Sequence, residues 1–275
     1  MMRKIFTILT VVVLILGIGF LLYPSIAKDF NTHKTDKVVD EFKLAVEQVN
    51  KNDPKNDDKS GDKSDKDKAL QNSSSHSDQS GDSTVQNQSG ATYFLDREKL
   101  DKLYQKLVEY NNDLKENGQS NGGNPFIFED QSVDLSEYGI TNGVIGYISI
   151  PAIDMNLPIY LGANEYNMAI GAAHLNKTSV PIGGESTNCA IAGHRGMINK
   201  IMFDNIVYLN KGDDVYIVNY WETLHYRVRE TKIIDPEDSN SLLIEKGKDL
   251  VSLITCHPYG SNSQRFLVIC ERVKQ

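Results

Sequence analysis

Three side chains in the C-terminal half of the chain have the types that cysteine-dependent acyl transfer requires. Cys256 ends the apolar run SLITC, Arg265 begins the next apolar run, and His194 follows the run CAIAG. A thiol is mostly protonated at neutral pH, so it needs a base or a cation nearby before it attacks a carbonyl carbon. A guanidinium can stabilise the oxyanion that this attack creates. Together the three residues would supply a nucleophile, a general acid or base and an electrophile at the rims of three strands.

Each of these residues also has a simpler interpretation. His194 could be a turn histidine bonded to a local carbonyl group, and Arg265 could be a surface arginine flanking a strand. Among the other histidines, His257 adjoins Cys256 and should point in a different direction, because successive residues at a strand end alternate. His174, in GAAHLN, lies in an expected loop, and its role stays open.

The other two cysteines, Cys189 and Cys270, lie inside strand-like apolar runs and are expected to be small core residues. An odd count of three cysteines leaves at least one free thiol. The chain contains no C-x₂-C or H-x₃-H pair, so we predict no metal site and no cofactor. The histidine precedes the cysteine, which is the reverse of the papain-like order, and the caspase signature Q-A-C-x-G is absent.

The elements that position these residues follow from composition. Residues 139–275 consist of short segments rich in Val, Ile and Tyr, separated by Gly, Asn, Asp or Pro. Seven or eight short strands with little room for helices predict a mainly β fold, a closed or nearly closed barrel.

Two helices are expected ahead of the barrel, at 34–50 and 95–117, from apolar residues recurring at three- and four-residue intervals. Between them, residues 51–91 form a polar insertion that has too few apolar side chains to offset its chain entropy, and we predict that it is disordered. Residues 118–138 connect the second helix to the barrel.

The N-terminus carries a membrane signal. Residues 5–23 contain no charge, and as a helix they would span about 28 Å, close to the thickness of a bilayer core. Arg3 and Lys4 predict that residues 1–4 are cytoplasmic and that the rest is extracellular, in a single-pass protein of the cell membrane. The alternative is a cleaved signal peptide, with a small-residue site at 25–27, although its apolar core would be unusually long. The net charge of −8 argues against nucleic acid as a partner.

The strings AIAGHRG and LITCHPYGSNSQR, in the order His, Cys, Arg, resemble the sortases, cysteine transpeptidases on the outer face of Gram-positive membranes. The resemblance runs over residues 139–273 and implies the sortase-type barrel. One departure is Ser252, where the family's T-L-x-T-C motif begins with Thr; serine keeps the hydroxyl group.

The resemblance implies a reaction. Cys256 attacks the Thr carbonyl of an LPxTG-like sorting signal, His194 protonates the departing Gly amine, and Arg265 steadies the substrate or the oxyanion. An incoming amine then releases the thioacyl enzyme. The implied partners are an LPxTG-type surface protein or pilin and an amine acceptor, which is a pilin lysine or a peptidoglycan precursor.

Within the family, the chain looks most like the class C, pilin-polymerising enzymes, whose lid carries an Asp-Pro-aromatic motif. Here that position reads Asn124-Pro125-Phe126, in the segment 118–138. Phe126 is expected over Cys256, but Asn124 cannot form the ion pair to arginine expected of the family's Asp. The alternatives are a wall-anchoring sortase that uses a peptidoglycan amine and, without enzymatic activity, a cell-surface scaffold or adhesion module.

Overall fold

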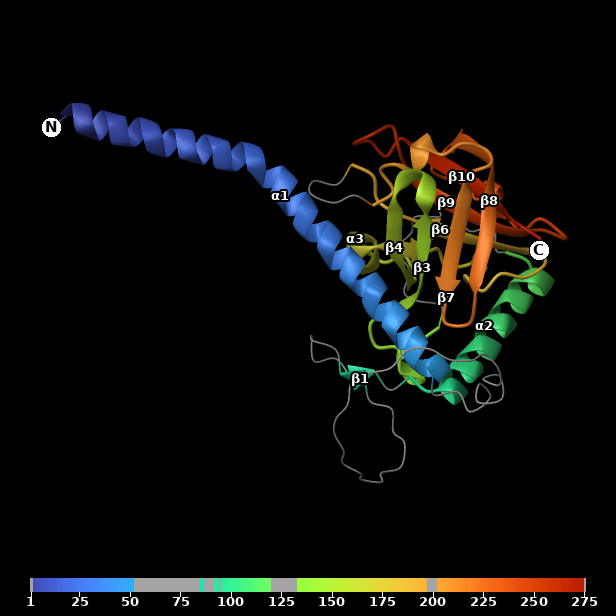
Figure 1. The fold of residues 1–275 in the computed structure, drawn as a ribbon. Helices are drawn as coiled ribbons and strands as arrows, with labels where there is room; N and C mark the ends of the chain where they lie inside the picture. Colours follow the sequence, from blue (N-terminus) through green and yellow to red (C-terminus); the bar gives the residue numbers. More distant parts are fainter. Residues whose placement is uncertain are drawn as a thin grey trace, which may run out of the picture.

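Eight strands, β3 to β10, close into a barrel (Figure 1). The computed structural model describes residues 2–51, 85–86, 92–93, 95–119, 133–196 and 202–274. The strands are β3 Val144–Ile150, β4 Met155–Leu161, β5 Ala172–His174, β6 Thr187–Ala192, β7 Asp214–Asn219, β8 Thr223–Ile234, β9 Asp249–His257 and β10 Gln264–Arg272. Their order around the barrel is β10-β8-β7-β3-β4-β5-β6-β9. The predicted class, a mainly β closed barrel of seven or eight strands, is confirmed.

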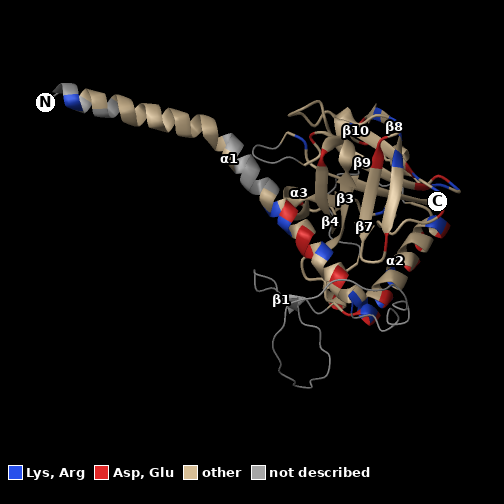
Figure 2. Ribbon diagram, in the orientation of Figure 1, with Lys and Arg blue, Asp and Glu red and all other residues tan. Residues whose placement is uncertain are grey.

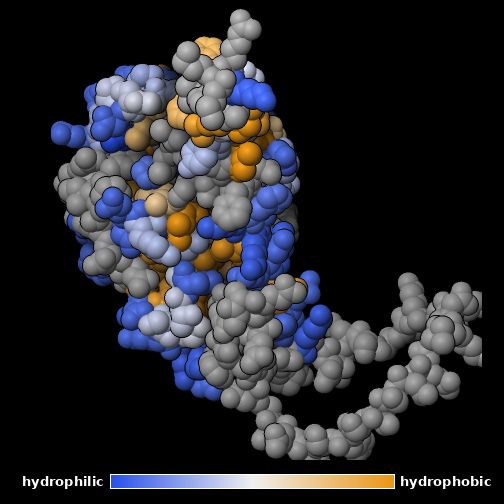
Figure 3. All heavy atoms as spheres, turned by 90° about the vertical axis from the view of Figure 1, so that its left-hand side faces the viewer, coloured by the Kyte–Doolittle hydropathy of each residue, from blue (hydrophilic) through white to orange (hydrophobic). Residues whose placement is uncertain are grey.

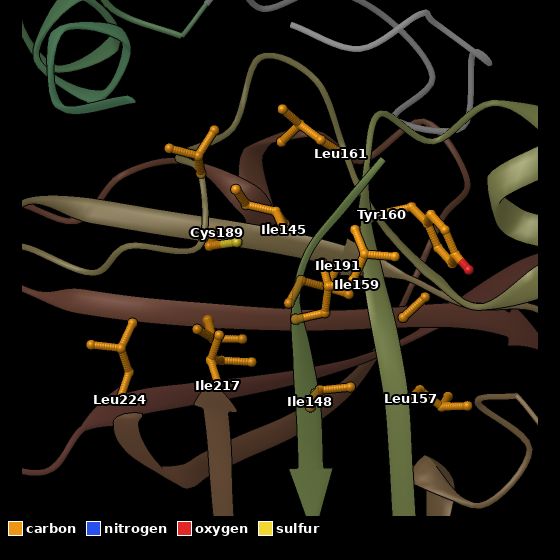
Figure 4. Packing of buried hydrophobic residues seen from close by; sticks show 14 of the residues in the cluster. Ile145, Ile148, Leu157, Ile159, Tyr160, Leu161, Cys189, Ile191, Ile217 and Leu224 are labelled. Atoms are coloured by element: carbon orange, nitrogen blue, oxygen red, sulfur yellow. The ribbon is translucent and has the colours of Figure 1, made fainter. Parts of the chain in front are cut away.

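Strand β9 lies between β6, which runs parallel to it, and β10, which runs antiparallel. Val251 and Leu253 of β9 belong to the main apolar core, whereas Leu250 and Ile254 belong to a second apolar cluster on the opposite face. Figure 4 shows part of the main core, where Cys189 lies among aliphatic side chains. Because both faces of β9 are covered, its sequence is almost continuously apolar instead of alternating.

A long helix, α1 Met2–Lys51, packs its C-terminal part on the barrel and projects away from it at its N-terminal end (Figure 1). Its buried side chains include Val39 and Val49, and the ring of Phe42 lies 5.9 Å from that of Tyr147 and 4.6 Å from that of Tyr220. The helix predicted at 34–50 is therefore present, as the last part of a longer helix. Among the described residues, no helix combines the length and hydropathy that crossing a membrane requires. The anchor expected at residues 5–23 stays a prediction.

The second helix, α2 Arg97–Asn117, agrees with the range expected from the sequence. Asp96 caps it by accepting a hydrogen bond from the backbone N–H of Lys99 (2.7 Å), and Leu100, Leu103 and Leu107 form its buried stripe. The remaining helical segments are short: α3 Glu165–Ile170, and the 3₁₀ turns η2 Leu135–Tyr138, η3 Pro151–Ile153, η4 Ile206–Tyr208 and η5 Asn240–Leu242.

Two expectations fall on parts of the chain that the structure does not describe. Of the insertion at 51–91, it describes Lys51 and the two-residue strand β1 Val85–Gln86, which pairs antiparallel with β2 Thr92–Tyr93. The lid residues Asn124, Pro125 and Phe126 lie outside the described residues. The disorder of the insertion and the lid both stay predictions.

Candidate active site

Cys256 and Arg265 are brought together by the hairpin of β9 and β10. In the antiparallel ladder the two residues are direct partners, one place before the last pair, Gln264 with His257. Directly opposed residues in such a ladder have Cβ atoms about 4.5–5.5 Å apart. The positions chosen from the sequence as strand rims therefore face each other.

His194 reaches the same place through the parallel pairing of β6 with β9. The ladder keeps a constant offset of 62 residues from Thr187–Asp249 to Ala192–Ile254, and His194 with Cys256 has the same offset. Two hydrogen bonds continue the pairing beyond the last ladder pair. The Gly193 N–H donates to the Ile254 carbonyl (3.2 Å), and the Thr255 hydroxyl donates to the Gly193 carbonyl (2.6 Å). His194 thus lies beside Cys256, on the side away from Arg265.

The alternation of side chains places all three residues on one face. Ala192, Ile254 and Leu267 belong to the second apolar cluster. Ala192 lies two residues before His194, Ile254 two before Cys256, and Leu267 two after Arg265. Residues two apart along a strand, or along its extension, point to the same face. The thiol, the imidazole and the guanidinium therefore converge on the face of that cluster, at one end of the barrel.

The backbone at His194 is fixed by the segment that follows it. The Phe203 N–H donates to the His194 carbonyl (2.9 Å), and the Phe203 ring packs directly against Gly193. A Cβ atom on Gly193 would lie 2.5 Å from that ring, so only glycine fits there. The next turn is held by Asp204, which accepts a hydrogen bond from the Gly196 N–H (3.0 Å).

Arg265 is 6% exposed, so the interpretation as a surface arginine is wrong. Its Nη1 donates to the carbonyl groups of Asn262 (2.7 Å) and Gln264 (3.0 Å), both in or next to the turn between β9 and β10. Burial lowers the pKa of Arg265, whereas the neighbouring Cys256 sulfur acts to raise it. This guanidinium stays charged at neutral pH, because an arginine titrates far above that range.

The other cysteines are core residues, as expected. Cys189 and Cys270 are buried, and burial raises the pKa of both thiols. Cys256 is half-buried, so of the three thiols it is the one that a substrate can reach.

His174, left open by the sequence, lies fully buried in β5, with Nε2 3.1 Å from the carbonyl groups of Thr178 and Ser179. Burial lowers the pKa of His174 to about 4, against the effect of those two carbonyl groups. It is a neutral core histidine.

Sequence reasoning missed the contacts of Arg195, which lies within reach of both His257 and Tyr259. No periodicity identifies them, although Arg195 and His257 each follow a candidate residue directly in the chain.

A half-buried thiol beside an imidazole and opposite a buried guanidinium can perform nucleophilic acyl transfer. Such an arrangement at the rim of a closed barrel defines a class of cysteine enzyme. The family model described as Sortase domain matches residues 148–273, which include all three candidates. Sortase A of Listeria monocytogenes is 30% identical over 172 residues, which cover 59% of this chain and 73% of that protein. The chain belongs to the sortase family of cysteine transpeptidases.

Solved structures add the subgroup. Sortase C-1 from Streptococcus pneumoniae superposes with a TM-score of 0.60 at 33% identity, covering 66% of this chain and 93% of that one. A pilus-related sortase C of group B Streptococcus gives a TM-score of 0.57 at 34% identity, covering 66% of this chain and 92% of that one. Against the curated relatives, all of them sortases A or D, the matched stretch spans 47% to 74% of their lengths. The resemblance to class C sortases is confirmed at the level of structure.

Proposed function

We propose that this protein cleaves an LPxTG-like sorting signal between Thr and Gly and transfers the new acyl group to an amine. The observation that carries the proposal is the position of Cys256 on β9, opposite Arg265 on β10 and beside His194 at the end of β6. The roles of the three residues follow from what each group can do at its place.

The first half-reaction forms a thioester. The Cys256 sulfur attacks the Thr carbonyl carbon, and the oxygen gains negative charge that Arg265 stabilises. His194, as the imidazolium, gives its proton to the Gly nitrogen while the C–N bond breaks. The Gly-containing fragment leaves as a free amine, and the acyl group remains on Cys256.

The second half-reaction restores an amide. An incoming amine attacks the thioester carbon, His194 takes the proton that the amine loses, and Cys256 leaves as the thiolate. The thioester conserves the free energy of the cleaved bond, so the transfer needs no ATP. This suits an enzyme that works outside the cell.

For the acceptor, we propose a pilin lysine, which would make the protein a pilus-assembly enzyme. Support comes from the class C structures and from the pilus-related sortase C of group B Streptococcus among them. The second candidate is a peptidoglycan amine, favoured by the sequence similarity to sortases A. A pilin and a peptidoglycan stem peptide, offered separately as acceptors, distinguish the two.

We also propose that Phe126 covers Cys256 as part of a lid. Support comes from the Pro-aromatic pair Pro125-Phe126, which stands at the position of the class C lid motif. Ahead of this pair, Gln119 is held at both ends of its amide: Nε2 donates to the Lys177 carbonyl (3.1 Å), and Oε1 accepts from the Ile244 N–H (2.6 Å). These bonds give the segment that follows a fixed starting point.

For the localisation, we propose attachment to the cell membrane through residues 5–23, with the barrel outside. Large apolar side chains from Phe6 to Tyr23 are exposed along α1. Figure 2 shows few charges on this half of the helix, whereas the half against the barrel carries many. Figure 3 shows apolar surface at the top of the molecule, on the side from which α1 projects. Membrane fractionation of the full chain and of a chain without residues 2–28 tests this: recovery of the full chain in the soluble fraction would contradict it.

The central experiment is mass spectrometry of the protein incubated with an LPxTG peptide, with and without an added amine. We expect cleavage at the Thr–Gly bond, a thioacyl adduct on Cys256 and an amide product with the amine. Cys256→Ala should give none of these. A protein that binds the peptide without cleaving it, in the parent and in Phe126→Ala, would favour the scaffold or adhesion alternative.

A further inference from the structure

Behind the three candidate catalytic residues lies a second layer of side chains, each one position further along the chain. His257 and Phe266 follow Cys256 and Arg265 on their strands, so they point to the opposite face. Their ring centroids are 6.0 Å apart. Phe266 packs against the main core, which places this pair on the barrel side of the site.

Arg195, which follows His194, joins this layer from the turn after β6. Its Nη1 lies 3.4 Å from Nδ1 of His257, and its guanidinium carbon lies 5.6 Å from the ring centroid of Tyr259. Among the described residues, none accepts a hydrogen bond from its Nε, although that nitrogen is shielded from water. Arginine donates only, so in this contact Nδ1 of His257 is the acceptor.

The backbone brings the same two turns into contact. A Cβ atom on Gly196 would lie 3.0 Å from the nitrogen of Gly260 and 3.3 Å from its Cα. The turn that carries His194 thus rests directly on the turn that follows Cys256. Arg195 is the side chain that joins the two turns, through one hydrogen bond and one ring contact.

We propose that Arg195 is a positioning residue that sets the spacing between His194 and Cys256 through its contacts with His257 and Tyr259. The inference rests on the proposed transpeptidase function. Both half-reactions move a proton at His194 while a bond forms or breaks at Cys256, so the rate depends on how the two groups are held. A displacement of 1 Å can cost about 10²-fold in rate.

The test compares two ways of replacing His257 with one way of replacing Arg195. Arg195→Met and His257→Leu both remove the hydrogen bond, and each should lower kcat about 10- to 100-fold with little change in KM. His257→Asn keeps an acceptor oxygen close to the place of Nδ1, so its kcat should stay near that of the parent. In the double variant Arg195→Met/His257→Leu, the losses should be less than additive, because both changes break the same hydrogen bond between Arg195 and His257.

A matched control is His225→Leu. His225 is also a half-buried strand histidine with one polar partner, Asp214 at 2.8 Å, but it lies on the wall formed by β7 and β8. Its replacement should leave kcat unchanged. The thermal midpoint of every variant is measured beside its kinetics. If Arg195→Met fails to fold, Arg195→Gln, which keeps a polar side chain of similar length, replaces it.

A second readout needs no substrate. A methanethiosulfonate reacts with cysteine as the thiolate, so the rate at which a small one modifies Cys256 reports on the groups held next to the sulfur. We expect this rate to fall in Arg195→Met and to be kept in His257→Asn. If the parent does not process the peptide but the modification rates follow this pattern, the positioning role stands and the proposed substrate is wrong. The inference is overturned if Arg195→Met keeps the parental kcat and modification rate, if the loss lies in KM, or if the double variant shows additive losses.

Discussion

Cys256 and Arg265 are direct cross-strand partners, and the guanidinium of Arg265 is buried and held by two carbonyl groups of its own hairpin. A charge so fixed needs no reorganisation when an oxyanion forms beside it. The cost of burying it is offset by hydrogen bonds that a more flexible cation would not make in the same geometry.

Replacement of Arg265 should therefore affect the chemical step. Arg265→Met should lower kcat by about 10²–10³, the loss usual for an oxyanion-stabilising donor. Arg265→Lys should restore only part of it, because an ammonium group cannot reproduce the planar fork of donors. Steady-state kinetics measure both. Arg227→Met, on the outer wall, is the control and should behave as the parent; equal kcat values for all three would contradict the assignment.

The three thiols should differ in reactivity. A methanethiosulfonate should modify Cys256 in the folded protein and leave Cys189 and Cys270 intact, because burial keeps these two protonated and shielded. Peptide mapping by mass spectrometry gives the sites. Modification of all three to the same extent under native conditions would mean that the barrel opens readily.

Phe126→Ala should increase the rate at which Cys256 is modified, if Phe126 covers the thiol as proposed. Phe128→Ala, two residues on in the same segment, is the matched control and should increase it less. The measurement is the second-order rate constant for modification of Cys256 in Phe126→Ala, divided by that in Phe128→Ala. A ratio of one would mean that the aromatic side chain at 126 does not cover the site.

Gly193→Ala should harm stability and activity together. The added Cβ would meet the Phe203 ring at 2.5 Å, and overpacking of this kind costs about 1–3 kcal/mol in the free energy of unfolding. His194 follows directly, so kcat should fall as well. Gly17→Ala serves as the control, since nothing lies within 4 Å of that position. Urea denaturation and kinetics measure the effects, and an unchanged unfolding midpoint in Gly193→Ala would contradict the packing argument.

His174 should make the stability depend on pH below neutrality. Its pKa is lowered to about 4 by burial from an ordinary 6.5, so between these values the unfolded chain binds a proton that the folded protein does not. Stability therefore falls as the pH drops from 6.5 towards 4, by up to about 3 kcal/mol. His174→Gln, which does not titrate, should lower the stability at pH 7 but weaken its pH dependence. Urea denaturation at several pH values checks this; parallel curves for parent and variant would refute it.

Much of the candidate site was predictable because each of the three candidate residues stands at one end of an apolar run. The turn between β9 and β10 is short, so the pairing of Cys256 with Arg265 is a local property of the sequence. The proximity of His194 and Cys256 is not a local property. Parallel pairing joins segments 62 residues apart, and no turn residue marks the register of β6 with β9. The same register was needed to find that Arg195 contacts His257.

The helices show a similar limit. The buried stripe of α2 follows from spacing alone, and so does the C-terminal part of α1. The continuity of α1 through Pro24 does not follow, since a proline inside a helix removes a hydrogen bond and usually ends or kinks it.

Arg265 reaches Cys256 across a hairpin, whereas His194 reaches it through a long-range parallel pairing. This difference has a consequence for the order in which the chain folds. A short hairpin closes quickly, whereas a contact across 62 residues must first offset the entropy of a much longer loop. We therefore expect Cys256 to meet Arg265 before it meets His194. If Cys256 and His194 have the proposed roles, a partly folded chain would carry a nucleophile without its base. We would then expect full reactivity of the thiol only in a molecule whose barrel has closed.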